Sequence, residues 1–139
     1  MPDTLMQAVI LAVDPDVQSA QSLRQILEEK GHAFYEAGLA ALDLKQTGHM
    51  PEPDLVIVSA DGPDANAHRR FRQIQKQFPQ AGLALLVNAD QLHEAMSAFK
   101  GRADEFISRP IEQTHLEIIL HRVLKTAALK IQNRQLELL

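Results

Sequence analysis

Four short polar segments stand out because each follows an apolar run. They are Asp14-Pro15-Asp16, Ser59-Ala60-Asp61, Asn88-Ala89-Asp90 and Ser108-Arg109-Pro110. Carboxylates are the oxygen ligands that a hard cation prefers, and an arginine suits an anion. A serine hydroxyl needs an adjacent base to become a nucleophile, and no histidine falls in these segments. With no cysteine among the 139 residues, thiolate chemistry and disulfides are excluded.

The elements that must position these segments follow from hydrophobic periodicity. Apolar runs predict buried strands at 6–13, 32–36, 54–58, 83–87 and 104–108, and amphipathic stretches predict helices at 17–30, 37–46, 65–78, 91–99 and 112–139. Strand and helix alternate throughout, which predicts one α/β domain with a doubly wound parallel sheet. Ligand sites in such sheets lie at the carboxyl ends of the strands, where the polar segments fall.

Four further sequence segments are informative because of their order and spacing along the chain. They are the Val13-Asp14 turn, the Asp54-Leu-Val-Ile-Val58 run, Pro63 four residues after Ser59, and Ala103-Asp-Glu-Phe-Ile-Ser-Arg-Pro-Ile111. Over residues 6 to about 126 the chain thereby resembles the receiver domain of two-component response regulators. The resemblance implies a flavodoxin-like, five-stranded sheet of order 2-1-3-4-5, a signalling role without enzyme activity, and a cis peptide bond before Pro110.

The family's chemistry depends on five groups. An aspartate ending the third strand accepts a phosphoryl group, two acids after the first strand help to hold Mg²⁺, and a threonine or serine and a lysine contact the phosphoryl oxygens. This chain matches the pattern only at Asp14. Pro15 stands at the second acid, Ser59 at the acceptor, Asn88 at the threonine or serine, and Arg109 at the lysine.

These replacements weaken the expected cation site. Asp14 and Asp16 remain as weak candidate ligands, and Asp61 would contribute at most its backbone carbonyl. We therefore expect weak or absent Mg²⁺ binding and no other cofactor. Arg109 is expected to pair with Asp14 or Asp61 and close the pocket. Alternatively, Asp14 and Asp16 act only as turn and helix-capping residues.

The residues favour a degenerate receiver that regulates an output domain or a protein partner without being phosphorylated. One alternative is a phosphorylation-competent receiver with an unconventional acceptor. Another, from a different class, is a small flavodoxin-like protein that binds flavin or nucleotide. Against this second alternative, no glycine-rich loop follows the first strand, where Asp14 and Asp16 would repel a phosphate.

The last predicted helix is longer than a receiver body needs. Leu120, Leu124, Ala127, Ile131, Arg134 and Leu138 recur at alternating spacings of four and three, as in a short coiled-coil seam. We expect a receiver-like domain at 1–122 and a helical extension at 123–139 that supports a homodimer and leads to an output domain. The alternative is an exposed linker helix.

Composition narrows the classes of partner. The net charge of −4 argues against a dedicated nucleic-acid binder. The basic cluster from His68 to Arg72, with Lys76, is interpreted as a solvated helix face, with an anion-binding or nucleic-acid-binding patch as the alternative. The longest apolar run near the N-terminus, 6–13, is far too short to cross a membrane. We expect a cytoplasmic protein without a membrane partner.

Overall fold

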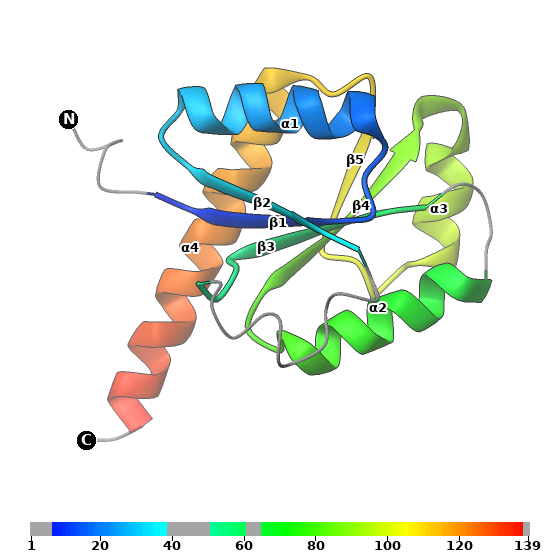
Figure 1. The fold of residues 1–139 in the computed structure, drawn as a ribbon. Helices are drawn as coiled ribbons and strands as arrows, with labels where there is room; N and C mark the ends of the chain where they lie inside the picture. Colours follow the sequence, from blue (N-terminus) through cyan, green and yellow to red (C-terminus); the bar gives the residue numbers. More distant parts are fainter. Residues whose placement is uncertain (1–6, 39–50, 61–64, 138–139) are drawn as a thin grey trace.

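A computed structural model describes residues 7–38, 51–60 and 65–137 of the chain. One parallel sheet contains five strands: β1 (Val9–Val13), β2 (Ala33–Ala37), β3 (Leu55–Ser59), β4 (Gly82–Asn88) and β5 (Glu105–Arg109). Their spatial order is β2-β1-β3-β4-β5 (Figure 1). The sheet order and the parallel pairing confirm the predicted flavodoxin-like fold.

Helices cover both faces of the sheet. They are α1 (Val17–Glu29), α2 (Ala65–Gln77), α3 (Leu92–Ala98) and α4 (Gln113–Glu137), and a short 3₁₀ turn at Ala89–Gln91 precedes α3. In Figure 1, α1 and α4 lie on one face, and α2 and α3 on the other. The helix expected over 37–46 falls mainly outside the described residues, and Ala37 itself ends β2.

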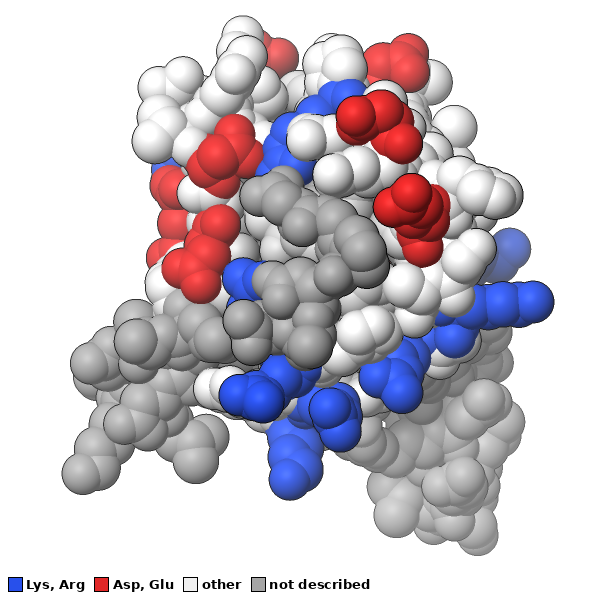
Figure 2. All heavy atoms as spheres, turned by 90° about the vertical axis from the view of Figure 1, so that its right-hand side faces the viewer, with Lys and Arg blue, Asp and Glu red and all other residues white. Residues whose placement is uncertain are grey.

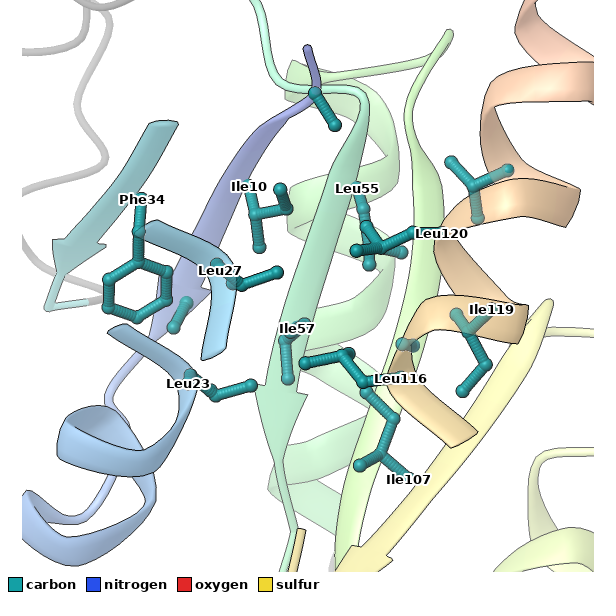
Figure 3. Close-up of a cluster of buried hydrophobic side chains, with 14 of the residues drawn as sticks. Ile10, Leu23, Leu27, Phe34, Leu55, Ile57, Ile107, Leu116, Ile119 and Leu120 are labelled. Atoms are coloured by element: carbon teal, nitrogen blue, oxygen red, sulfur yellow. The ribbon is translucent and has the colours of Figure 1, made fainter. Parts of the chain in front are cut away.

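The core on the α1 and α4 face explains why the strands are so apolar. Ile10 of β1 and Ile57 of β3 pack with Leu23 and Leu27 of α1 and with Leu116 of α4 (Figure 3). Successive residues of a strand point to opposite faces. Because helices cover both faces, the inner strands β1, β3 and β4 are apolar at nearly every position, and the alternation typical of a one-sided sheet is missing from them.

The second core lies beneath α2 and α3. Leu11 and Val13 of β1 pack with Phe71 and Ile74 of α2, and Phe99, just after α3, is buried in the same cluster. The two clusters hold the strands between them. The carboxyl ends of the strands are therefore positioned by the core.

The packing of α4 corrects two expectations. Leu120, expected in a dimer seam, is only 4% exposed and belongs to the first core cluster. Leu124, expected in the same seam, is partly buried against that cluster, and Val123 is buried within it. The helix presents these side chains to the sheet because they continue the apolar face begun at Leu116. The packed body thus extends past residue 122.

The rest of the expected seam is not described at the level of side chains. The backbone of α4 continues as helix to Glu137, so Ala127 and Ile131 lie on it, while Leu138 is outside the described residues. Figure 1 shows the C-terminal part of α4 extending beyond the sheet. A seam formed by this helix would begin after Leu124.

Candidate functional site at the carboxyl edge of the sheet

Strand register brings the predicted site residues to one edge. Ser59 ends β3, and Asn88 and Arg109 are paired at the ends of β4 and β5. Asp14 follows β1 directly, next to the end of β3, because Val13 is in register with Val58. Asp61 lies outside the described residues. The sequence therefore identified the correct edge for Asp14, Ser59, Asn88 and Arg109.

Arg109 connects three elements. Its Nε donates to Ser19 Oγ at 2.9 Å and to Asp16 Oδ1 at 3.2 Å, and its Nη1 donates to Asn88 Oδ1 at 3.3 Å. Its Nη2 also forms an ion pair with Asp16 at 3.0 Å. The planar guanidinium can bind acceptors on several sides at once, which a lysine ammonium at the end of a single stem does less well. Arg109 thus ties β5 to β4 and to the start of α1.

Arg109 forms an ion pair with Asp16, which was not among the partners expected from the sequence. Asp61, one of the two expected partners, lies outside the described residues, so the expected pairing stays a prediction. The contact with Asp16 has a geometric reason, because Asp16 caps α1 and its second carboxylate oxygen then points toward the end of β5. The peptide bond between Arg109 and Pro110 is cis, the geometry that the resemblance implied.

Asp16 has two roles in this arrangement. Its Oδ2 accepts a hydrogen bond from the backbone N–H of Ser19 at 3.0 Å and caps α1, while its Oδ1 faces Arg109. Burial alone would raise the pKa of Asp16. The hydrogen bonds from Ser19 and the positive charge of Arg109 outweigh burial, so the pKa lies below its ordinary value of 3.8. The carboxylate therefore occupies the anion-binding position at the N-terminus of α1.

Ser19 is the residue that sequence reasoning missed. It is a polar side chain only 4% exposed, and its hydroxyl accepts from Arg109. The available signal was its position three residues after Asp16. This spacing places Ser19 in the first helical turn, where its backbone N–H meets the capping carboxylate and its hydroxyl lies beside it.

Ser59 lies outside the hydrogen-bonded group formed by Arg109, Asp16 and Ser19. Its Oγ is buried and has no hydrogen-bond partner in the described part of the chain. With no hydrogen bond to a base among the described residues, the hydroxyl is a poor nucleophile there. A buried hydroxyl without a partner also costs folding free energy.

Asp14 is held by its backbone in an uncommon conformation. Its φ is +49°, in the left-handed region that aspartate tolerates better than most residues. Its backbone N–H donates to the carbonyl of Ala37 at 2.9 Å, which joins the turn to the end of β2. Its carboxylate approaches Gly38 closely, since a Cβ there would lie 3.3 Å from Asp14 Oδ1. The side chain is therefore directed along the β1–β2 side of the edge.

A hollow opens beside Arg109. It has a volume of about 360 Å³ and is lined by Asp16, Gln18, Ser19, Ser22, Asn88, Arg109, Pro110 and Ile111. Within the described ranges, neither Asp14 nor Ser59 lines it. In the same ranges, no group of three or more histidine, aspartate or glutamate side chains is arranged to hold a metal ion.

The sequence of the chain was compared with protein families and with curated proteins. No protein-family model matches the chain. It is similar to the cell cycle transcriptional regulator CtrA of Caulobacter vibrioides, with 20% identity over 118 residues that cover 84% of this chain and 50% of that protein. The chain thus spans about half the length of the curated relative that it matches.

Solved structures are also similar to this chain. NtrX of Brucella abortus, in complex with ATP, has 27% identity and a TM-score of 0.75, over 94% of this chain and 30% of that one. A response regulator receiver domain protein of Clostridium thermocellum has 24% identity and a TM-score of 0.71, over 88% and 98%. This chain has the receiver fold.

One further neighbour shares this fold. An adenylate cyclase structure from Rhodopirellula baltica has a TM-score of 0.74 at 17% identity, over 94% of this chain and 96% of that one. At this identity the likeness concerns the receiver fold alone. Among the helices in the described ranges, none is both long and apolar enough to cross a membrane.

Proposed function

We propose that this chain is a receiver-like domain of two-component signalling that works without aspartyl phosphorylation and regulates an output domain or partner through protein contact. The observation that carries the proposal is the state of the carboxyl edge. Arg109 is bound to Asp16, Ser19 and Asn88, while a serine with a buried, unpartnered hydroxyl stands at the acceptor position.

The contacts of Arg109 support a single arrangement of the edge. To contact a phosphoryl group near Ser59, the guanidinium would have to leave partners on both α1 and β4. Its side chain is 19% exposed and that of Asp16 is 48% exposed, so solvent screens their ion pair and limits its worth to about 1 kcal/mol or less. The hydrogen bonds with Ser19 and Asn88 add to this value. We infer that the edge keeps this state in the active form.

The residues at the edge do not fit the magnesium site of a phosphorylated receiver. Pro15 supplies no ligand in place of the second acid, and Ser59 supplies no carboxylate. The carboxylate of Asp16 is already engaged by Arg109 and by the N-terminus of α1. We therefore assign no step of the function to a metal ion or to a transferred phosphoryl group.

The proposed output is inferred from the relatives and from α4. CtrA and NtrX are longer than their matched regions, which agrees with a domain that acts on a fused or separate partner. The helix α4 continues to Glu137, past Val123 and Leu124, which pack with the core. We propose that this extension supports dimerisation and transmits regulation, with no catalysis in this domain.

The test is phosphorylation by a small-molecule donor. The chain is incubated with acetyl phosphate and Mg²⁺ beside a receiver domain that is known to accept phosphate, and both are weighed intact by mass spectrometry. We expect the control to gain the mass of one phosphoryl group and this chain to gain none. A stoichiometric adduct on this chain would overturn the proposal, and fragmentation would then locate the unconventional acceptor.

A further inference from the structure

The outward face of α2 carries a line of positive charge. Arg69, Arg72 and Lys76 are all exposed, and they recur at spacings of three and four, which places them on one side of the helix. Phe71 and Ile74, on the opposite side, are buried in the core. The three cations, called here the α2 basic stripe, therefore point into solvent.

The loop after α3 widens this surface. The ring of His68 stacks on Phe99, with 4.1 Å between ring centroids and 11° between planes. Arg102 Nη1 lies 3.1 Å from His68 Nδ1. These contacts hold the exposed Arg102, and Lys100 next to Phe99, beside α2. Two further cations thus flank the stripe.

The stripe lies on a stretch of chain without carboxylates. Arg24, Lys30, Arg109 and Arg122 each form an ion pair with a carboxylate. Arg69, Arg72 and Lys76 form none within the described ranges, and residues 65–81 contain no aspartate or glutamate. Like charges at these spacings repel each other and weaken a helix. An anionic partner would relieve this repulsion.

Positive and negative side chains lie on different parts of the surface. In Figure 2, Lys and Arg side chains gather along the lower part of the molecule, over α2, whereas Asp and Glu gather in the upper part. The positive region exists although the net charge of the chain is −4. The positive region is therefore local, and its electrostatic field can orient a partner of opposite charge.

We propose that the α2 basic stripe docks an acidic helix of a partner protein, with carboxylates at the same three- and four-residue spacings. Neighbouring side chains on such a helix lie about 5–6 Å apart, which matches the spacing of cations on α2. A nucleic acid is a poorer match, because the net negative chain repels a polyanion at long range. The aromatic rings of Phe71 and Phe99 are also buried and offer no surface for stacking bases.

The test uses defined peptides and a charge-matched pair of variants. The probe is a labelled helical peptide with glutamates in one stripe, compared with a peptide of the same composition whose glutamates surround the helix. Binding is followed by fluorescence anisotropy at low salt. The stripe variant is Arg69→Gln/Arg72→Gln/Lys76→Gln. The control, Arg24→Gln/Lys30→Gln/Arg122→Gln, removes the same charge from exposed positions elsewhere.

We expect the striped peptide to bind wild type and control alike, and the stripe variant about tenfold more weakly, or about 1.4 kcal/mol. The scrambled peptide should bind wild type more weakly than the striped one. Circular dichroism confirms that both variants remain folded. The phosphorylation test above does not bear on this proposal.

Four results would overturn it. Equal losses in the two variants would mean that only net charge matters. Tighter binding of a short duplex DNA of matched charge would indicate a nucleic-acid surface. Salt-sensitive self-association that the stripe variant loses would make a second copy the occupant. No measurable binding of the striped peptide would remove the acidic helix as the occupant.

Discussion

At the scale of single residues, Arg109 stands where the receiver resemblance implies a lysine, and it determines how the end of β5 is held. A lysine would reach one acceptor group at the end of a flexible stem, whereas the fork of Arg109 binds acceptors on α1 and β4 together. Asp16 makes this possible because it caps α1 with one oxygen and binds Arg109 with the other. The two residues act as a unit.

Substitutions at Asp16 separate its two roles. Asp16→Ala removes the helix cap and the ion pair, and should lower the free energy of unfolding by about 1 kcal/mol or somewhat more. Asp16→Asn keeps an oxygen for the cap and loses only the charge, so its loss should be smaller. Urea unfolding at neutral pH measures both. Equal losses would show that the cap contributes little.

His32 predicts a dependence of stability on pH. Its Nδ1 accepts a hydrogen bond from the backbone N–H of Ala8 at 2.9 Å. Burial lowers the pKa of His32 below 6.5, and the nearby charge of Asp54 only partly opposes this. The unfolded chain therefore binds the proton more readily than the folded chain. Stability from this group is complete above pH 6.5 and falls as the pH drops through the lowered pKa of the folded state.

The variant His32→Asn tests this dependence. An asparagine oxygen can still accept from Ala8 but cannot titrate in this range. The free energy of unfolding of wild type should fall between about pH 7 and about pH 5, while that of the variant falls less. Parallel decreases in the two proteins would assign the pH dependence to other groups.

At the scale of elements, α4 contributes to the core before it extends away from it. Leu116, Ile119 and Leu120 are buried against the sheet, whereas Ile118 is 50% exposed. Gly82 allows this approach, because a Cβ there would lie 3.3 Å from Cγ2 of Val123. The first half of α4 is thus part of the body.

Leu120→Ala tests that assignment. It should create a cavity and lower the free energy of unfolding by about 2–5 kcal/mol. Ile118→Ala, at an exposed position of the same helix, should change it by about 0.5 kcal/mol or less. Both losses are measured by urea unfolding at two protein concentrations. A loss at Leu120 that depends on concentration would restore it to a dimer seam.

The elements were largely predictable because buried strands and amphipathic helices have strong periodic signals. The strands, the sheet order and the cap at Asp16 were predicted correctly. The role of Leu120 was not, since a core face and a coiled-coil seam share the same spacing and only tertiary packing separates them. The contact of Arg109 with Asp16 was also not predicted, because strand register locates the ends of β4 and β5 but does not give the direction of a long side chain.

At the scale of the whole molecule, we propose that the body and the C-terminal part of α4 have separate functions. Val123 and Leu124 pack with the first core cluster, and we propose that the part of α4 beyond Thr126 serves assembly. We expect the full chain to be a dimer and a chain of residues 1–126 to be a monomer with a similar free energy of unfolding. Light scattering with size-exclusion chromatography measures the masses. Two monomers, or two dimers, would exclude dimerisation by the extension.

The central claim is that the carboxyl edge functions in one fixed state, without a metal ion or a phosphoryl group. The most direct measurement is an NMR titration of the labelled chain with millimolar Mg²⁺, followed by the phosphoryl mimic beryllofluoride. We predict no saturable shift in the backbone signals of Asp14, Ser59 and Asn88 or in the Nε–H signal of Arg109. Saturable shifts at these groups, with release of Arg109 from Asp16 and Ser19, would contradict the account.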